Sequence, residues 1–288
     1  MEATELLKKV RKIEIKTRGL SKNIFAGEYH SAFKGRGMAF SEVRDYQYGD
    51  DIRNIDWNVT ARFNHPYIKV YEEERELTVM LLVDVSGSRN FGTHTQLKKN
   101  MITEISAVLS FSAIQNNDKI GMIMFSDRIE KFISPKKGRQ HILRIIRELI
   151  NFEPARQQTD ITEALRYFTN VIKKRSTAFI ISDFFDEDYK DALKIASKKH
   201  DIIALNIYDI REKDLPPVGL IRVKDAETGK SLWIDSNNKK TRDHYTRWWH
   251  QQQDKLDVTF KRYGIDSARI RTDEDYVRPL MSLFKHRA

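Results

Sequence analysis

The fold of this chain is decided by residues Leu77–Ser88, whose sequence is LTVMLLVDVSGS. A short, continuous apolar run of this kind predicts a strand that is buried on both faces of an α/β sheet. The run ends in Asp84, Ser86 and Ser88, and open α/β sheets bind ligands just beyond the carboxyl ends of their strands. Carboxylate and hydroxyl oxygens are hard donors. The segment therefore predicts a site for Mg²⁺, with Mn²⁺ or Ca²⁺ as alternatives.

The same polar residues also have a simpler explanation. Asp-x-Ser-x-Ser is a short pattern, and Ser, Gly and Asp are common in turns. Asp84 or Ser88 would then cap the next helix and bind nothing. This motif alone does not distinguish a helix cap from a ligand site, so further evidence has to come from other segments of the chain.

Two such segments lead to the same edge of the predicted sheet. Thr159 stands just before an apolar-periodic helix that runs to about Lys173. Residues 176–183 have the same pattern as the first strand, a run of β-branched and apolar side chains followed by an aspartate, Asp183. Each residue again has a structural alternative: Thr159 as the N-cap of its helix, and Asp183 as the cap of a helix from about Glu187.

With these residues together, the chain resembles a von Willebrand factor type A (vWA) domain. The likeness is carried by the following side chains: Asp84-x-Ser86-x-Ser88, Thr159 followed by Asp160, and Asp183 after an apolar strand. In that family the corresponding aspartates and hydroxyls form the metal-ion-dependent adhesion site. Gln157 and Gln158 stand where the family often has glycines, so this chain departs from the pattern in the Thr159 loop.

The resemblance implies a role for each candidate residue. Ser86, Ser88 and Thr159 would supply hydroxyl ligands to a divalent cation. Asp84 and Asp183 would act directly or through water molecules. The sixth position would be left to water or to a carboxylate of a partner protein.

Residues upstream resemble the prokaryotic domain-of-unknown-function family 58, and the likeness extends over about residues 20–210. It rests on GEYHS at 27–31, GRGMAF at 35–40, Glu-Val-Arg-x-Tyr at 42–46 and the run GDDIRNIDW at 49–57, followed by Thr60-Ala61-Arg62. Members commonly lie beside MoxR-type AAA+ ATPases in their genomes. The resemblance therefore implies an adaptor or assembly factor that works with such an ATPase.

Enzymatic classes find little support in the sequence. The chain has no cysteine, which excludes disulfides, thiolate metal sites and cysteine catalysis. It has no Walker A motif, no His-Glu-x-x-His motif and no Gly-x-Ser-x-Gly elbow. Asp84 and Asp183 with Mg²⁺ leave a Mg-dependent hydrolase or phosphoryl-transfer enzyme as the alternative to an interaction module.

The formal net charge of +10 favours acidic partners. The basic residues are scattered among acidic ones, so a solvated surface explains them as well as nucleic-acid or membrane-surface binding does. We interpret the chain as a metal-dependent, non-catalytic protein-interaction module. Basic charge around the metal would then aid the approach of a partner carboxylate.

The pattern along the chain predicts an N-terminal part, 1–76, and a vWA-like domain, 77–288. In the first part, a helix over residues 4–18 precedes an extension of short strands and loops. It packs on its own domain or lies on an anionic membrane. No signal peptide and no apolar run of about 20 residues is visible, and we expect a cytoplasmic protein.

Alternation of strands and helices over the core, 77–209, predicts a doubly wound, mostly parallel α/β sheet with helices on both faces. A hairpin insertion follows at about 215–235, and closing helices with a last strand occupy 238–288. Trp57 is predicted to be a core anchor. The charged residues around it are expected to form either an ion-pair and cap network or a partner-binding face: Arg44, Asp50, Asp51, Arg53, Asp56 and Arg62. The aromatic cluster Tyr245, Trp248 and Trp249 is expected to be buried, or to form a patch if exposed.

Overall fold

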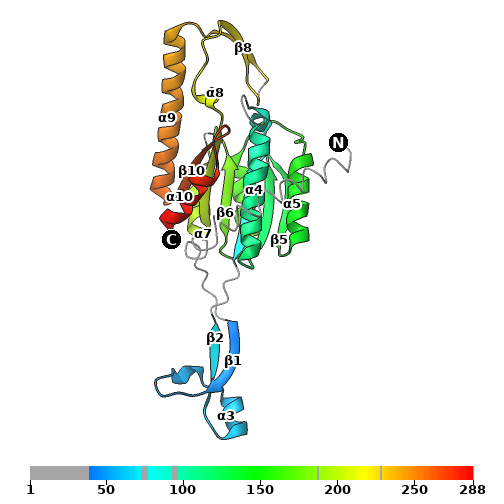
Figure 1. Ribbon diagram of the computed structural model, residues 1–288, viewed down its shortest axis with the longest axis vertical. Helices are drawn as coiled ribbons and strands as arrows, with labels where there is room; N and C mark the ends of the chain where they lie inside the picture. Colours follow the sequence, from blue (N-terminus) through cyan, green and yellow to red (C-terminus); the bar gives the residue numbers. More distant parts are fainter. Residues whose placement is uncertain (1–38, 73–76, 93–96, 187, 228, 288) are drawn as a thin grey trace. The chain divides into compact units, whose positions relative to one another are not determined.

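The computed structural model describes residues 39–72, 77–92, 97–186, 188–227 and 229–287 (Figure 1). The chain divides into two compact units. The described residues 39–72 and Leu77 belong to the small unit, and the described residues from 78 onward belong to the large one. The helix predicted over residues 4–18 lies outside the described residues.

The small unit is a two-stranded antiparallel ribbon with two short helices between its strands. Its elements are β1 (Ala39–Asp45), the 3-10 helix η1 (Ile52–Asn54), α3 (Trp57–Phe63) and β2 (Tyr67–Glu72). The ribbon pairs Ala39 with Glu72 at one end and Asp45 with Tyr67 at the other. The described part of the predicted extension, residues 39–72, contains two strands joined by two short helices.

Ion pairs and caps hold the connection between the two strands. The Arg44 guanidinium donates to both Asp50 oxygens at 2.9 and 2.8 Å, and Asp50 also accepts from the Gln47 backbone at 2.8 Å. Asp56 caps α3 by accepting from the backbone of Asn58 at 3.0 Å. The ion-pair and cap network expected from the sequence is therefore present, although the structure gives Arg62 no role in it.

The prediction that Trp57 anchors a core is wrong. Trp57 opens α3 and exposes 70% of its surface. Over residues 42–70, Ile68 is the only apolar side chain that is buried. A ribbon of this size has too little chain around it to enclose a large indole, so the side chain stays at the surface.

The large unit alternates strands and helices. Its first half consists of β3 (Thr78–Asp84), η2 (Gly87–Asn90), α4 (Lys98–Gln115), β4 (Lys119–Phe125), β5 (Ile129–Lys136), α5 (Arg139–Asn151) and α6 (Ile161–Val171). Its second half consists of β6 (Thr177–Ser182), α7 (Lys190–Lys199), β7 (Asp201–Tyr208), α8 (Ile210–Lys213), β8 (Leu220–Lys224), β9 (Ser231–Asp235), α9 (Lys239–Tyr263), β10 (Asp266–Arg271) and α10 (Val277–Arg287).

Six strands form the central sheet in the order β10-β7-β6-β3-β4-β5. All neighbouring pairs are parallel except β4 and β5, which are joined as an antiparallel hairpin at the edge. The order reverses between β3 and β6, where the chain crosses from one half of the sheet to the other. The predicted doubly wound, mostly parallel α/β fold is confirmed.

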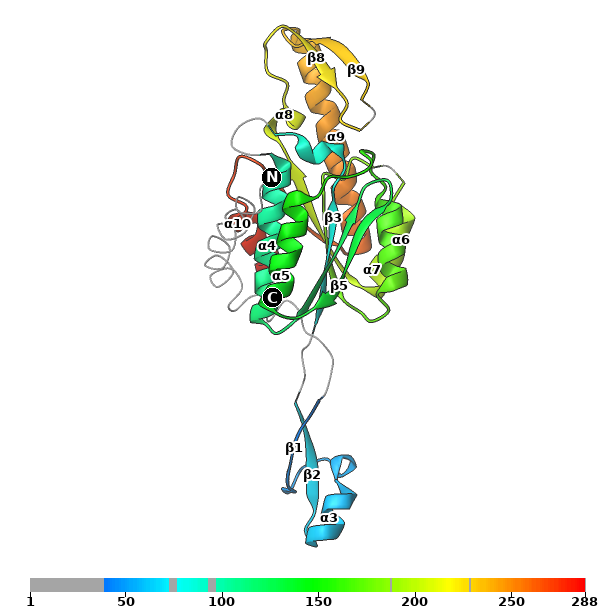
Figure 2. The ribbon, with the colours of Figure 1, turned by 90° about the vertical axis from the view of Figure 1, so that its right-hand side faces the viewer.

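Helices cover both faces of this sheet (Figure 2). On one face, α6, α7 and the C-terminal half of α9 pack their apolar side chains on Met80, Leu82 and Ile180. On the other, α4 and α5 lie together, and Phe284 of α10 contacts Phe179 of β6 with ring centroids 6.3 Å apart. Because both faces are covered, β3 is apolar along almost its whole length and not alternating.

The hairpin β8–β9 stands apart from the central sheet and joins α8 to α9. Arg222 pairs with Trp233, and both strands are largely exposed. Asn238 caps α9, and Gly264 ends it in the left-handed conformation with a φ of 63°. Within the aromatic cluster of α9, Trp249 is buried, whereas Trp248 is half-exposed and stacks on Phe185 with ring planes 5° apart.

His200 ends α7 inside the core, with 2% of its surface exposed. Its ring lies against Phe168 at a centroid distance of 4.4 Å, and Nδ1 is 3.1 Å from the Ser176 hydroxyl. Burial, followed by the charges of Lys199 and Arg175, lowers the pKa of His200 from 6.5 to about 4. The folded protein therefore keeps this imidazole neutral.

We predict that His200 makes the protein less stable as the pH falls from about 6.5 to about 4. In this interval the unfolded chain binds a proton that the folded chain excludes, so the stability present at higher pH is lost. His200→Gln should flatten the slope of unfolding free energy against pH, measured by urea denaturation. His244→Gln, at an exposed position of α9, is the matched control. Equal slopes in the wild type and His200→Gln would contradict this prediction.

Candidate functional site

The register of the sheet brings the two predicted aspartates to one edge. Val83 of β3 pairs with Ile181 of β6, so Asp84 is level with Ser182, the residue before Asp183. The Ser182 hydroxyl donates to Asp84 Oδ2 at 2.6 Å. Both carboxylates are buried. The convergence of the two strand ends follows from parallel pairing, because parallel strands finish on the same side.

The serines after β3 turn back over these carboxylates. Asp84 Oδ1 accepts from the Ser86 backbone at 2.9 Å, which folds the loop tightly after the strand. Hydrogen bonding by Ser86 lowers the pKa of Asp84, and hydrogen bonding by Ser88 lowers the pKa of Asp183, each against the larger opposite effect of burial. The two hydroxyl oxygens lie 3.2 Å apart. One hydroxyl donates to the other, and each oxygen keeps at least one further lone pair.

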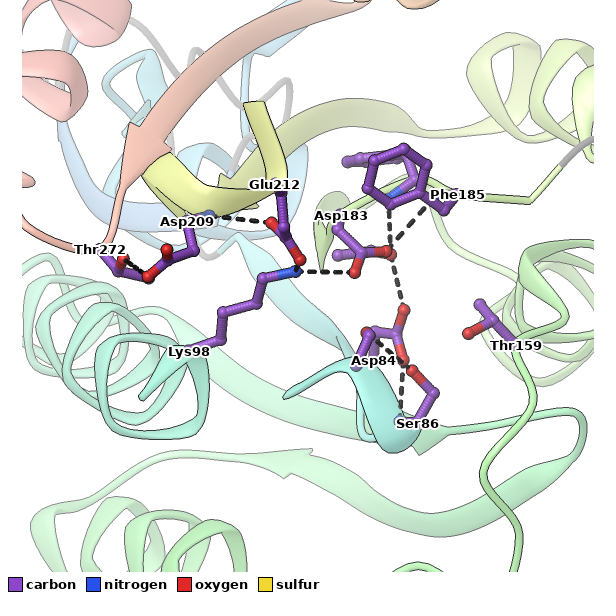
Figure 3. A network of polar contacts seen from close by, with 12 residues as sticks. Asp84, Ser86, Lys98, Thr159, Asp183, Phe185, Asp209, Glu212 and Thr272 are labelled. Atoms are coloured by element: carbon purple, nitrogen blue, oxygen red, sulfur yellow. Dashed lines mark hydrogen bonds and ion pairs between the residues drawn. The ribbon is translucent and has the colours of Figure 1, made fainter. Parts of the chain in front are cut away.

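The Thr159 loop reaches the same edge through backbone contacts. Gly87 N–H donates to the Gln157 carbonyl at 2.9 Å, and Asp160 N–H donates to the Ser126 carbonyl at 2.9 Å. Figure 3 shows the Thr159 side chain directed toward Asp84 and Ser86. The structure thus gathers all of the predicted site residues at the end of the sheet.

The alternative cap roles of these residues are not observed. Asp160, and not Thr159, caps α6 by accepting from the Glu163 backbone at 2.8 Å. The cap residues of α4 and α7 are Leu97 and Tyr189, and neither helix has a side-chain cap. Thr159 and Asp183 therefore do not cap the helices proposed for them, although Asp84 and Asp183 each accept a backbone hydrogen bond that turns the loop after their strand.

A third carboxylate enters from the β8–β9 turn. The Thr159 hydroxyl donates to Glu227 Oε1 at 2.7 Å. Burial raises the pKa of Glu227 to about 7, the Thr159 hydrogen bond opposes this, and the charges of Asp183 and Asp84 add to it. Thr159 therefore has a carboxylate acceptor, whereas the printed hydrogen bond of the two serine hydroxyls joins them to each other.

Lys98 brings a buried cation to the network (Figure 3). It is the first residue of α4, and its ammonium lies 2.9 Å from Asp183 Oδ2 and also pairs with Glu212. Glu212 is held in turn by the capping box of α8, where its other oxygen accepts from the Asp209 backbone at 2.8 Å. Thr272 donates to the Asp209 side chain at 2.7 Å.

The two aspartates respond differently to this environment. Burial, together with the charge of Asp183, raises the pKa of Asp84 to about 6. Burial alone would raise the pKa of Asp183 as well, but the charge and hydrogen bond of Lys98 outweigh it and lower that pKa. Among the ion pairs of the described residues, Asp84 and Glu227 take part in none, although the charge of the buried Arg89 acts on Asp84.

A cavity of about 740 Å³ opens beside these groups. Its walls come from residues 183–186 and 188–190, the β8–β9 turn and α9, and include Ser88 and the exposed Phe185–Trp248 stack. Its charged lining residues are Asp183, Asp186, Asp188, Glu212, Asp225, Glu227, Lys190 and Lys255. The expectation of basic charge around the site is therefore wrong for this cavity, which is mainly acidic.

The oxygen donors fit a hard divalent cation. Neighbouring ligands of an octahedral Mg²⁺ lie about 3 Å apart when each bond is about 2.1 Å, and the Ser86 and Ser88 oxygens have this spacing. Within the described residues, no three or more His, Asp or Glu side chains gather where they could hold a metal ion. Any ion here would therefore need the hydroxyl oxygens as ligands.

Sequence reasoning missed Lys98, Glu212 and Glu227. Only Glu212 had a local signal, because Asp209 and Glu212 have capping-box spacing. Lys98 comes from a helix that begins well after the serine loop, and Glu227 comes from the turn of a hairpin. Nothing in the local sequence distinguishes either residue from an ordinary surface charge.

Residues 42–255 match the family described as Protein of unknown function DUF58. The chain belongs to this family. A relative of this DUF58 protein is an uncharacterized protein of Mycobacterium bovis, which is 27% identical over 277 residues, or 94% of this chain and 86% of the relative. A shorter uncharacterized protein of Mycobacterium avium is 26% identical over 137 residues, or 46% of this chain and 79% of the relative.

Solved structures similar to the DUF58 chain include the conserved hypothetical protein BatB from Bacteroides thetaiotaomicron. It has 16% sequence identity and a TM-score of 0.48, and the match covers 73% of this chain and 98% of BatB. The SpRpn10 VWA domain matches 73% of this chain and 95% of its own length, with 11% identity and a TM-score of 0.39. In the described part of the chain, no helix is both long and apolar enough to cross a membrane.

We predict that Lys98→Met destabilises the DUF58 chain by about 3–5 kcal/mol, because it leaves Asp183 and Glu212 buried without their cation. Urea denaturation followed by circular dichroism measures this change. Lys194→Met, at an exposed position of α7, should change stability by no more than about 0.5 kcal/mol. A loss below about 1 kcal/mol in Lys98→Met would show that the ion pair does not hold the site together.

Proposed function

We propose that this protein is a metal-dependent protein-interaction module. Ser86, Ser88 and Thr159 bind one divalent cation, most favourably Mg²⁺, and Asp84 and Asp183 assist directly or through water. The cation then docks a carboxylate of a protein partner. No step of this proposal requires the chain to catalyse a reaction.

The observation that carries the proposal is the meeting of three hydroxyl oxygens at the ends of β3 and β6. The Ser86 and Ser88 hydroxyls hydrogen-bond each other at 3.2 Å and Thr159 donates to Glu227 at 2.7 Å, so each oxygen keeps a lone pair for a cation. Neutral hydroxyl ligands leave a bound cation with most of its charge, and such a cation favours an anionic ligand from outside.

The acidic cavity makes the cation necessary for docking. Without a cation, a partner carboxylate would meet Asp183, Asp225 and Glu227 and be repelled. A divalent cation bound at the hydroxyl oxygens offsets part of this negative charge and gives the carboxylate a positive centre to bind. The net charge of +10 then helps the encounter only over distances longer than the cavity.

As the partner we propose a MoxR-type AAA+ ATPase, for which this chain is an adaptor or assembly factor. Membership of the DUF58 family supports this choice through the genome neighbourhood of that family. The absence of a P-loop is consistent with an adaptor that depends on the ATPase for its energy. The small unit also exposes Tyr48, Trp57 and Phe63, and aromatic side chains are enriched at protein interfaces.

We expect wild-type protein to bind one Mn²⁺ or Mg²⁺ per chain and the Ser86→Ala, Ser88→Ala double variant to lose this binding. The double variant removes two of three proposed ligands and keeps both aspartates in place. Isothermal titration calorimetry measures the affinity. Ser197→Ala, at the surface of α7, is the control and should bind like the wild type. Equal metal binding by the double variant and the wild type would rule out the serine ligands.

A second test separates docking from a purely structural role of the metal. We expect a purified MoxR-type AAA+ ATPase from the same organism to bind the immobilised protein in Mg²⁺ but not in EDTA. EDTA should lower the melting temperature only modestly, because the sheet and its helices pack without the ion. Biolayer interferometry and thermal unfolding measure the two effects.

The Asp84→Ala variant serves as the control for EDTA, since it weakens the site without removing metal from the partner ATPase. Binding that survives EDTA would refute docking through the metal. Unfolding of the large unit in EDTA would instead assign the metal a structural role.

A further inference from the structure

The β8–β9 turn rests directly on the candidate metal loop. At Gly87 an added Cβ would lie 2.4 Å from the Ala226 carbonyl oxygen and 3.2 Å from Gln157 Cβ. Only a residue without a side chain allows the turn to come this close. The contact therefore joins the Ser86–Ser88 loop, the Thr159 loop and the hairpin at one point.

The turn is built so that Glu227 points into this contact. Asp225 accepts from the Glu227 backbone at 2.9 Å, and Asp225 N–H donates to the Lys230 carbonyl at 2.8 Å. The Glu227 side chain is then held by the Thr159 hydroxyl at 2.7 Å. A separation of this size is close to the distance of about 3 Å between neighbouring oxygen ligands of an octahedral Mg²⁺.

The position of Glu227 is electrostatically unfavourable without a cation. It shares one cavity with Asp183 and Glu212, and the only cation that pairs with those two among the described residues is Lys98. The charges of Asp183, Asp84 and Asp225 act against the ionised form of Glu227. A divalent ion at the hydroxyl oxygens would offset this repulsion and stabilise the inward-facing conformation of the Glu227 side chain.

The hairpin is attached to the large unit mainly at its base. There the Ser236 hydroxyl donates to the Gly219 carbonyl at 2.7 Å, and Arg242 of α9 donates to the Ser236 carbonyl at 2.7 Å. Its strands are exposed, and a two-stranded hairpin without a covered face is only marginally stable. The tip is therefore able to leave the site without unfolding the central sheet.

We propose that Glu227 is an internal carboxylate ligand that takes the docking position of the partner carboxylate and keeps the site closed until the β8–β9 tip moves away. This inference rests on the proposed function and adds its regulation. Partner binding is then a competition between two carboxylates for one cation. The Glu227 carboxylate has a high effective concentration because it belongs to the same chain. Only a partner that also displaces the hairpin can therefore bind the cation with its own carboxylate.

The test uses Mn²⁺ alone as the probe, with the whole chain. Water-proton relaxation reports how many water molecules are coordinated to the bound Mn²⁺. Glu227→Ala should carry about one more coordinated water than the wild type, because water fills the vacated position. Glu227→Gln, which keeps the shape of the side chain, tests the contribution of its charge and should bind Mn²⁺ more weakly.

Asp235→Asn is the matched control, since it removes one carboxylate from an exposed position on the same hairpin. It should leave both hydration and affinity as in the wild type. Unchanged hydration in Glu227→Ala, even with weaker Mn²⁺ binding, would overturn the inference and leave Glu227 only as the acceptor that orients Thr159. Tighter binding in Glu227→Gln would also overturn it. Failure of the wild type to bind Mn²⁺ at all would refute the proposed function together with this inference.

Discussion

The ion pair between Lys98 and Asp183 is the interaction on which the end of the sheet depends. Parallel pairing forces Asp84 and Asp183 to the same edge, where both are buried. Two carboxylates in such surroundings would not both stay ionised, and the ammonium of Lys98 fixes the charge on Asp183. Asp84 has no ion pair and accepts hydrogen bonds from Ser182 and the Ser86 backbone, so its charge next to the serine loop is the part that a bound cation can neutralise.

The residues at the strand ends could be predicted from the sequence, whereas Lys98 and Glu227 could not. Asp84, Ser86 and Asp183 follow buried strands, and the ends of parallel strands must converge, so their meeting is dictated by the fold class. Lys98 and Glu227 reach the site from a helix start and a hairpin turn, whose directions depend on tertiary packing. From sequence alone, a lysine at the start of a helix is expected at the surface. The Lys98 side chain is buried here because it pairs with two carboxylates, those of Asp183 and Glu212.

The fold was predictable for a related reason. Long apolar runs and helical periodicity in the large unit report burial on both sides of a sheet, and the order of its strands and helices follows from them. Trp57 failed as a core prediction because the same rule was applied to a small ribbon. An indole is buried only where enough surrounding chain exists to enclose it, and residues 42–70 bury a single apolar side chain.

The distribution of charge links the site to the hairpin. A net charge of +10 would lead one to expect a basic docking surface, yet the cavity has six carboxylates and two lysines in its lining. An acidic cavity that binds a partner carboxylate needs a cation of higher charge density than a lysine ammonium group. Neutral hydroxyl ligands leave the charge of such a cation in place. Because a cation of this kind attracts every nearby carboxylate, the carboxylate of the adjoining turn is its first competitor. The chemistry that makes the site receptive to a partner therefore also makes it able to close on itself.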